Sequence, residues 1–386
     1  MKEEILKKIC SASCVVIDSR KIQPGGVFIA TKGERVDGHS FIPQVFEKGA
    51  SLVICEKLPE GDPGPCVQVE DSFKALSEIA SYYRKTLKTK IIGVTGSVGK
   101  TTTKEQIAAV LKQKYRVCAT EGNLNNEIGV PLTLLRIRPE DEVAVVEMGI
   151  NHFGEMSRLT ELVRPDMAVI TAIGECHLEA LGDLDGVLKA KSEIFEGMAE
   201  DAPVFLNGDD AKLKTVQRKN LIWFGDGCNA AEAVGRYLGL SDEEIREGLE
   251  KIQPLAGRGR LVRGPKYTVI DDCYNANPTS MRYSVDRLCR TAPENRVAIL
   301  GDMFELGENE AKMHAAVGDY VREKGVERLI TAGKLSENMK AAEHYASTEE
   351  LLKALPELKL DGCTILVKAS HGMHFEKIVE VLEHGI

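Results

Sequence analysis

The chain lacks any long apolar segment. None of its hydrophobic runs approaches the roughly 20 residues that a membrane-spanning helix needs. Its first eight residues form a charged amphipathic piece without the apolar centre of a signal peptide. These absences argue against an integral membrane protein. They predict a cytoplasmic protein with no stable insertion into a membrane.

Clustered cysteines and surplus positive charge are also missing. The ten cysteines include no Cys-x-x-Cys pair, and the closest two are Cys10 and Cys14. A disulfide framework or a zinc site would group them, so we expect reduced thiols. The formal net charge of −9 argues against general nucleic-acid binding. An anionic ligand must therefore be held by local groups, such as helix N-termini and a few lysines or arginines.

The composition that remains, 43% apolar and 28% charged over 386 residues, is typical of a globular protein with two or three domains. Residues 1–88 carry short β-rich runs. From Lys90 onward, apolar strands alternate with amphipathic helices, which indicates a parallel sheet covered on both faces. A Gly- and Arg-rich turn region over Gln253–Gly264 precedes another strand–helix series. We therefore predict an α/β protein with a small α/β domain (1–88), a central P-loop domain with a doubly wound, mostly parallel sheet (89–253) and a Rossmann-like domain (254–386).

One stretch of the central domain has few predicted strands. Between Phe205 and Leu240 only one strand is visible, Leu221–Phe224, and a Gly-Asp-Gly turn follows it at once. A full α/β domain usually uses more chain to close its sheet. The other strands expected in the central and Rossmann-like domains are Ile91–Thr95, Glu142–Met148, Met167–Ala172, Pro203–Leu206, Tyr267–Asp271, Arg296–Leu300, Arg328–Thr331 and Thr364–Val367.

A glycine-rich loop follows the first strand of the central domain. The order is strand, Thr-Gly-Ser-Val-Gly-Lys-Thr, then helix, although Val94 stands where the strict phosphate-loop pattern has its first glycine. Such a loop directs backbone N–H groups and a helix N-terminus at phosphate oxygens. Lys100 is expected to reach the outer phosphates and the Thr101 hydroxyl to bind Mg²⁺. The expected nucleotide-binding residues are Thr95, Gly96, Ser97, Val98, Gly99, Lys100, Thr101 and Thr102.

Polar residues occur where neighbouring strands end. Glu147 interrupts the apolar run Glu142–Met148 near its end, and His177 follows the next strand. Ligands of doubly wound sheets bind beyond the carboxyl ends of the strands, so Glu147 is a candidate Mg²⁺ ligand. His177 is a second candidate. A histidine after a strand is also often only a hydrogen-bonded surface residue, and that alternative stays open.

Lys191 interrupts the apolar face of a helix expected over Leu184–Met198. It is three or four residues from Val187, Leu188, Ile194 and Phe195, whereas Lys189 shares its face with two glutamates and is expected in solvent. A buried ammonium without a partner is costly and tends to lose its proton. The neutral amine can react with CO₂ to give a carbamate, an anionic metal ligand. The alternative is a lysine that extends to the helix edge.

Taken together, these segments resemble the Mur ligase family over nearly the whole chain. The family's ATP loop is matched by Thr95–Thr101, and its substrate loop by Gly122–Pro131. Its metal segments are matched by Val146–Gly149 and Cys176–Glu179. Lys189–Ile194 is similar to the segment that holds the family's carbamylated lysine, which supports Lys191.

The resemblance also implies where a UDP-sugar binds. Asp18-Ser-Arg20, Lys32-Gly-Glu-Arg35 and Asp37-Gly-His39 are similar to the region that holds it, so residues 1–88 would be a UDP-sugar-binding domain. The substrate-binding residues implied in this domain and in the central loop are Ser19, Arg20, Lys32, Asp37, His39, Asn123, Asn125 and Asn126.

Two carboxy-terminal segments, Asp271–Pro278 and Gly301–Gly307, resemble the branch of the family that adds D-alanyl-D-alanine. The resemblance implies Asn275 and Asn277 near the adenine, Asp302 near the ribose and Arg260 near the γ-phosphate. Arg258, in the same Gly-Arg-Gly-Arg run, is a rival for that last role. Ordinary turn chemistry is the alternative for these loops, since Asn, Gly and Pro are common turn residues.

Two segments depart from the family pattern. Around Gly225–Asn229 the family has more strands before the helix that starts at Asn229, so either this version is trimmed or the chain joins segments that flank something missing. The second departure lies near the carboxy terminus. The family's Lys-Gly-Ser-Arg is here Lys368-Ala-Ser-His371, and Ser370 and His371 are the candidate residues for the incoming dipeptide. Replacing a permanently charged, bidentate arginine by histidine weakens a carboxylate clamp. His371 can still donate a hydrogen bond, but second-substrate affinity or identity is put in doubt.

The resemblance implies a monomeric ATP-dependent ligase of peptidoglycan synthesis. It would join the carboxylate of UDP-N-acetylmuramoyl-tripeptide to D-alanyl-D-alanine through an acyl phosphate, with two Mg²⁺ ions. Thr101 and Glu147 would hold one ion; His177, carbamylated Lys191 and Glu147 would hold the other. Lys100, Glu147, His177, Lys191 and Arg260 would be catalytic. The alternatives are another ligase of the superfamily, such as the tripeptide-forming enzyme or a folylpolyglutamate synthase, and a nucleotide-binding protein without turnover.

Overall fold

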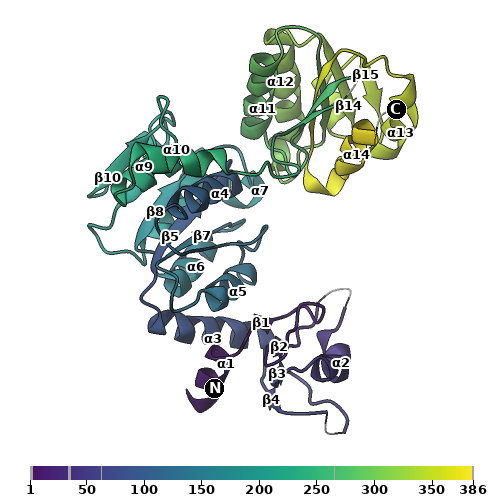
Figure 1. Cartoon of the computed structure of the whole chain (residues 1–386). Coiled ribbons are helices and arrows are strands. Elements are labelled where there is room, and N and C mark those ends of the chain that lie inside the picture. Colours follow the sequence, from purple (N-terminus) through teal and green to yellow (C-terminus); the bar gives the residue numbers. More distant parts are fainter. Residues whose placement is uncertain (1–2, 34–35, 62, 265, 385–386) are drawn as a thin grey trace. The chain divides into compact units, whose positions relative to one another are not determined.

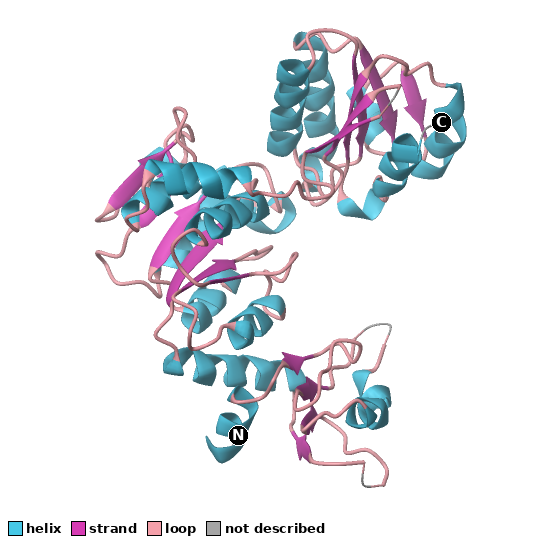
Figure 2. Ribbon diagram, in the orientation of Figure 1, coloured by secondary structure: helices cyan, strands magenta, loops and turns pink. Residues whose placement is uncertain are grey.

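The computed structural model describes residues 3–33, 36–61, 63–264 and 266–384. Three α/β regions follow one another along the chain, each built on its own sheet (Figures 1 and 2). Each sheet lies within one of the ranges predicted as domains. By their contacts, however, the residues form two compact units, Met1–Thr171 with Ala190–Lys251, and Ala172–Lys189 with Ile252–Ile386. The predicted domain boundaries therefore stay a prediction, and each unit is described by itself.

The amino-terminal region is a small parallel sheet in the order β1-β2-β3-β4. The short β-rich runs expected at Cys14–Ile17, Gly26–Ala30 and Ser51–Cys55 contain three of its strands. Their side chains form a small core with α2, including Phe28, Ile42 and Val53. Its elements are α1 (Glu3–Cys10), β1 (Val15–Val16), β2 (Val27–Ile29), η1 (Gly38–Phe41), α2 (Ile42–Glu47), β3 (Leu52–Cys55), β4 (Cys66–Gln68) and α3 (Ser72–Thr86).

The central sheet has six strands in the order β10-β9-β8-β5-β7-β6, and every neighbouring pair is parallel. Its strands are β5 (Lys90–Thr95), β6 (Val117–Ala119), β7 (Val143–Glu147), β8 (Met167–Ile170), β9 (Val204–Asn207) and β10 (Leu221–Phe224). The inner strands are apolar along their length because helices cover both faces, as expected for a doubly wound sheet. The predicted parallel sheet is confirmed.

The helices of this region lie on the two faces of the sheet (Figure 1). One face packs against α4, α9 and α10, whose apolar residues join the strands in one core. Helices α5 and α6 contact each other and α3 on the other side. The bounds are α4 (Lys100–Leu111), α5 (Gly129–Arg136), α6 (Glu155–Val163), α7 (Leu178–Leu181), α8 (Leu184–Ser192), η2 (Glu193–Phe195), η3 (Leu213–Thr215), α9 (Ala230–Tyr237) and α10 (Asp242–Glu250).

The short stretch after Phe205 closes the sheet with little chain. Strand β10 pairs in parallel with β9, and a tight turn at Gly225 and Cys228, joined by two backbone hydrogen bonds, leads to α9. Asn229 caps that helix by accepting a hydrogen bond from the Glu232 N–H. The brief connection is therefore compatible with a complete parallel edge.

The carboxy-terminal sheet has the order β11-β12-β16-β13-β14-β15 and is parallel except for β11. The turn expected over Gln253–Gly264 is partly wrong, because Arg260–Arg263 is strand β11, antiparallel to β12. The bounds are β11 (Arg260–Arg263), β12 (Thr268–Asp271), α11 (Pro278–Thr291), β13 (Arg296–Gly301), η4 (Gly307–Asn309), α12 (Glu310–Glu323), β14 (Arg328–Ala332), η5 (Ser336–Met339), β15 (Glu343–Tyr345), α13 (Thr348–Ala354), η6 (Leu355–Glu357), β16 (Thr364–Lys368), η7 (His371–Met373) and α14 (Glu376–His384).

Two cores cover the faces of this sheet. Helices α11 and α12 pack on one face, and α13 and α14 on the other. In the ranges that the structure describes, no helix is both long enough and apolar enough to cross a bilayer.

Candidate active site

The glycine loop joins β5 to α4 at the carboxyl edge of the central sheet. Gly96 and Gly99 have φ angles of 146° and 84°, in the left-handed region that L side chains rarely adopt. Gly99 is the N-cap of α4 and, having no side chain, leaves the amides of the first turn uncovered. This is the backbone geometry of a phosphate-binding loop, and it confirms the strand–loop–helix order expected from the sequence.

Side chains from neighbouring strands brace the loop. The Thr171 hydroxyl, just after β8, donates to the Val98 carbonyl at 2.5 Å, and its N–H donates to the Thr95 carbonyl at 3.0 Å. Asn207, the last residue of β9, donates to the Thr171 carbonyl at 3.1 Å. Lys100 Nζ lies 2.8 Å from the Gly96 carbonyl oxygen. The strand ends thus fix the loop's shape.

Glu147 lies in this site with one carboxylate oxygen engaged and one open. Thr101 Oγ1 donates to its Oε1 at 3.1 Å, and Asn125 Nδ2 donates to the same atom at 2.7 Å. Glu147 is 1% exposed, and its Oε2, like the Thr95 hydroxyl, is buried without a hydrogen-bond partner. A buried polar atom without a partner is costly, so the open oxygen marks a place for a ligand.

The chemistry of these donors fits Mg²⁺. Mg²⁺ takes oxygen ligands and is commonly held by one or two carboxylates together with substrate phosphates. Thr101 and Glu147, the predicted pair, supply a hydroxyl and a carboxylate beside the phosphate loop. Among the described residues no three His, Cys, Asp or Glu side chains cluster to hold a metal alone. A hydroxyl and a carboxylate beside the phosphate loop suit an ion that is bound together with nucleotide phosphates.

Lys191 lies in the last turn of α8. The prediction that it is buried is confirmed, since it is 1% exposed, whereas Lys189 on the same helix is exposed. The helix expected to run to Met198 instead ends at Ser192 and continues as the 3-10 turn η2. Burial of Lys191 removes it from bulk water, as its place in the apolar stripe indicated.

His177 belongs to the unit that contains the carboxy-terminal region. Its Nδ1 lies 2.5 Å from Glu305 Oε2, and both residues have left-handed backbone conformations. A carboxylate on one ring nitrogen fixes the ring's orientation, a common arrangement behind metal-binding histidines. Its predicted role as a ligand remains a prediction.

In the carboxy-terminal unit, several predicted nucleotide residues also hold the loops together. Asn275 is exposed, while Asn277 Oδ1 accepts from the Ser280 N–H at 2.7 Å in a capping box that begins α11. Asp302, 5% exposed, accepts from the Leu335 and Ser336 N–H groups at 3.0 and 2.7 Å. These local bonds agree with turn chemistry, and the adenine and ribose roles stay predictions.

The two rival arginines have different surroundings. Arg260 is paired with Asp271 Oδ2 at 3.2 Å and with Glu383. The Arg258 guanidinium lies 3.8 Å from the centre of the Tyr274 ring. Arg260, predicted for the γ-phosphate, is thus held between two carboxylates, and Arg258 stays its rival.

The two residues predicted to bind the incoming dipeptide are Ser370 and His371. Ser370 Oγ accepts from the Phe304 N–H at 2.9 Å, and Ser370 is 3% exposed. His371 is exposed, and its ring centre lies 5.5 Å from that of Tyr274. Ser370 therefore holds the loop that contains Phe304, and His371 is the one of the two residues that solvent can reach.

The amino-terminal candidates include two close acid–base pairs. Arg20 forms a bidentate ion pair with Asp18, with Nε 2.9 Å from Oδ1 and Nη2 2.8 Å from Oδ2. These hydrogen bonds lower the pKa of Asp18 to about 2. Asp37 Oδ1 lies 2.6 Å from His39 Nδ1, while His39 Nε2 accepts from the Glu56 N–H. Lys32 and Asp37 are joined through their backbones by an isolated antiparallel β-bridge, and Ser19 is buried. Glu34 and Arg35 of the same motif lie outside the described residues.

The asparagines of the predicted substrate loop, Gly122–Pro131, have different hydrogen-bond partners. Asn125 contacts Glu147, whereas Asn126 Oδ1 accepts from the Gly129 N–H at 2.9 Å at the start of α5. Asn123 is exposed.

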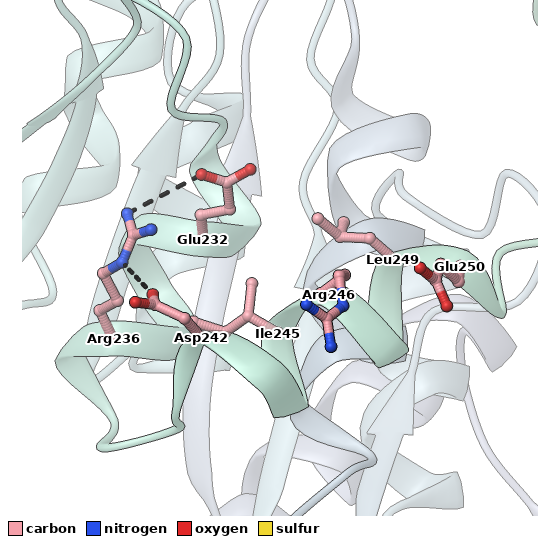
Figure 3. A pocket seen from close by; sticks show the side chains of 7 residues that line it. All are labelled: Glu232, Arg236, Asp242, Ile245, Arg246, Leu249 and Glu250. Carbon is pink, nitrogen blue, oxygen red and sulfur yellow. Dashed lines mark hydrogen bonds and ion pairs between the residues drawn. The ribbon is translucent and has the colours of Figure 1, made fainter.

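A shallow surface hollow elsewhere in the first unit contains none of the predicted residues. Figure 3 shows Arg236 between Glu232 and Asp242, whose carboxylates lie 3.8 and 3.0 Å from its guanidinium. The lining residues come from α9 and α10 and are Glu232, Arg236, Asp242, Ile245, Arg246, Leu249 and Glu250. Because Arg236 is already paired with two carboxylates, the hollow has less unpaired charge than the residue types in its lining would indicate.

Sequence reasoning missed several residues of the site. Lys104 and Thr120 lie behind Glu147, and Thr171 and Asn207 brace the glycine loop. Applying the strand-end argument used for Glu147 to the predicted strands before Thr171 and Asn207 would have found these two, whereas the strand before Thr120 was itself not predicted. No simple pattern marked Lys104.

A glycine loop at the carboxyl edge of a parallel sheet, with a strand-end glutamate beside its threonine, defines a P-loop nucleotide-binding protein. The sequence matches the Mur ligase family description over residues 11–84 (catalytic domain), the Mur ligase middle domain over 94–243, and the glutamate ligase domain over 257–371. The chain belongs to the Mur ligase family.

Individual relatives agree over the full length. The UDP-N-acetylmuramoyl-tripeptide–D-alanyl-D-alanine ligase of Bacillus subtilis is 35% identical, covering 95% of this chain and 92% of the relative. The structure of MurF from Acinetobacter baumannii has a TM-score of 0.86 at 28% identity, covering 99% and 98% of the two chains. MurF ligase from Thermotoga maritima, solved in complex with ADP, has a TM-score of 0.83 at 27% identity, covering 100% and 99%.

Proposed function

We infer that the chain is an ATP-dependent ligase that joins the carboxylate of UDP-N-acetylmuramoyl-tripeptide to the amine of D-alanyl-D-alanine in peptidoglycan synthesis. The observation that carries this conclusion is the pairing of Thr101 with Glu147 beside the phosphate loop, in a chain that matches a UDP-N-acetylmuramoyl-tripeptide–D-alanyl-D-alanine ligase over 95% of its length. The first supports a site for a metal-bound nucleotide, and the second supports the choice of substrates.

The reaction requires two anions to meet. The peptide carboxylate attacks the ATP γ-phosphorus, giving an acyl phosphate and ADP, and the dipeptide amine then displaces phosphate from the acyl carbon. Positive charge and orientation matter more here than a nucleophilic side chain. The loop amides and Lys100 supply charge, and the bonds from Thr171 and Asn207 keep the loop rigid.

Thr101 and Glu147 are the residues that would hold Mg²⁺ in the first site. The ion, when bound, neutralises phosphate charge and orients the transferred group. Asn125 keeps the Glu147 carboxylate turned toward Thr101, because both donate to the same oxygen. For the second ion we propose His177, Lys191 as its carbamate, and Glu147.

We propose that Lys191 is carbamylated. The support for this proposal is the burial of Lys191 in a helix of the family's lysine segment. The competing account is an unmodified lysine that pairs with neighbouring polar groups. The two differ in charge, since the carbamate is an anion and the ammonium a cation.

Among ligases of the superfamily, the amino-terminal pairs favour a UDP-sugar over a folate. Asp18–Arg20 and Asp37–His39 place charged groups near the surface of the small domain. None of the ten cysteines forms a disulfide, which supports a reducing compartment, and we propose the cytoplasm.

Phosphate release from ATP tests this function. We expect rapid release only when UDP-N-acetylmuramoyl-tripeptide and D-alanyl-D-alanine are both present, together with the pentapeptide product by mass spectrometry. A panel of UDP-peptides would define the third residue. Phosphate release without any product, or no release with any pair, would rule out the ligase and leave a nucleotide-binding protein.

A further inference from the structure

Thr120 connects the edge strand β6 to the metal site. It follows β6 directly, and its own N–H continues the sheet by donating to the Val145 carbonyl at 3.0 Å. Its hydroxyl accepts a hydrogen bond from the Glu147 N–H at 2.9 Å. One residue therefore fixes the end of β7 at two points, two residues apart.

The loop after Thr120 fixes the other side of Glu147. Asn125 donates to the Glu147 carboxylate, and its carbonyl accepts from the Gly149 N–H at 2.7 Å. Gly149 leaves no room for a side chain, since a Cβ there would lie 2.9 Å from Asn125 Cγ. The backbone and carboxylate of Glu147 are thus both held by the segment from Thr120 to Asn125.

Lys104 anchors that segment from behind. It lies in α4 one helical turn after Lys100, and its Nζ donates to the Thr120 carbonyl at 2.7 Å. Its side chain is 0% exposed and pairs with Glu105, whose side chain is 37% exposed. Burying an ammonium group costs free energy unless its hydrogen bonds are satisfied. A lysine that served only to fill this space would therefore destabilise the protein.

We propose that Lys104 and Thr120 are positioning residues that hold the Glu147 carboxylate for the magnesium–nucleotide complex. Lys104 fixes the Thr120 carbonyl, Thr120 fixes the Glu147 backbone, and the open Oε2 then points from a rigid strand end. Helix α4 carries both Thr101, which donates to the Glu147 carboxylate, and Lys104, which acts on the Glu147 backbone through Thr120. The inference rests on the proposed function only in taking Glu147 as the metal carboxylate.

The test compares ADP binding with and without Mg²⁺ by isothermal titration calorimetry. The variants are Lys104→Met, which keeps length but removes the donor, and Thr120→Val, which keeps shape but removes the hydroxyl. We expect either variant to lose roughly 10- to 100-fold of the affinity gained on adding Mg²⁺, as for other residues that support a metal ligand. ADP binding without Mg²⁺ should change little. Thr120→Ser should restore most of the loss.

Lys112→Met is the matched control, because Lys112 is exposed at the end of the same helix. The double variant adds a second criterion. If Lys104 acts through Thr120, Lys104→Met should cost less in the Thr120→Val background than in the wild-type protein.

Several results would overturn the proposal. It fails if Mg²⁺ strengthens ADP binding equally in the wild-type protein and both single variants. It also fails if both lose affinity equally with and without Mg²⁺, since that describes general destabilisation. If Lys104→Met does not fold, Thr120→Val and Thr120→Ser decide the outcome. A wild-type protein that binds Mg²⁺–ADP but makes no pentapeptide would refute the proposed function and leave this test intact.

Discussion

The Thr101 hydroxyl donates a hydrogen bond to Glu147 Oε1 over 3.1 Å, joining the first turn of α4 to the last residue of β7. The two residues are 46 positions apart, and neither lies in a loop that could adjust freely. This contact places a buried carboxylate beside a phosphate loop. The predictions below follow from that arrangement and from the polar groups around it.

Glu147→Gln should lower ligase kcat/KM by about 100-fold or more, because an amide keeps the volume but loses the negative charge that a divalent cation requires. Mg²⁺-dependent ADP binding should fall with it, measured by calorimetry. Glu161→Gln, an exposed glutamate of α6, serves as the control. Retention of near-normal activity in the Glu147 variant would exclude it as a metal ligand.

Lys191→Ala should lose most ligase activity, with partial recovery when a short carboxylic acid such as formate fills the place of the carbamate. Lys189→Ala, on the same helix but exposed, should behave like the wild-type protein. Carbon-13 NMR after incubation with labelled bicarbonate should show a carbamate signal that is absent from the Lys191 variant. Full activity in Lys191→Ala would remove this residue from the mechanism.

Arg258 and Arg260 should separate by the kind of defect they cause. Arg260→Ala breaks a pair with the buried Asp271, so we expect a loss of about 1–2 kcal/mol of stability, less than for a fully buried pair because the Arg260 side chain is 31% exposed. If Arg260 serves the γ-phosphate, as predicted, Arg260→Ala should also lower kcat, whereas Arg258→Ala should leave both the thermal unfolding midpoint and kcat near those of the wild-type protein. A loss of kcat confined to Arg258→Ala would assign the γ-phosphate role to Arg258.

His371→Arg restores the residue found in the family pattern and should lower the KM for D-alanyl-D-alanine by roughly threefold to tenfold, because a guanidinium binds a carboxylate with two charged donors. The KM for ATP serves as the internal control and should not move. An unchanged dipeptide KM would place the dipeptide's carboxylate away from this position.

The stability of the carboxy-terminal unit should fall in mild acid because of His314. The ring is fully buried, its Nε2 accepts from the Met303 N–H at 2.9 Å, and burial lowers its pKa. Below a pH of about 6.5 the unfolded chain takes up a proton that the folded chain resists, so stability drops by at most about 1.4 kcal/mol per pH unit.

His314→Gln should flatten that acid dependence of the unfolding midpoint between pH 5 and 7. His152→Gln, with a side chain that is 68% exposed, should leave the slope unchanged. Equal slopes for the wild-type protein and the His314 variant would show that other groups control the acid response.

The fold could be predicted where local pattern and environment agree. Buried strands such as β5 and β7 are continuous apolar runs, so their positions were expected to within a residue or two. The missed strands, β4, β6, β11 and β15, are three or four residues long and partly exposed. A half-exposed edge strand has too little hydrophobic contrast to stand out from a loop.

For the site, the order of the residues was enough to predict the glycine loop, the strand-end Glu147 and the burial of Lys191. Each of these depends on residue types within a few positions, and local backbone geometry determines where such residues lie. The partners of the polar side chains followed from the three-dimensional fold: Arg260 with Glu383, His177 with Glu305, and Lys104 with Thr120. A polar side chain binds whatever group folding brings within about 3 Å, and that choice depends on contacts between distant segments.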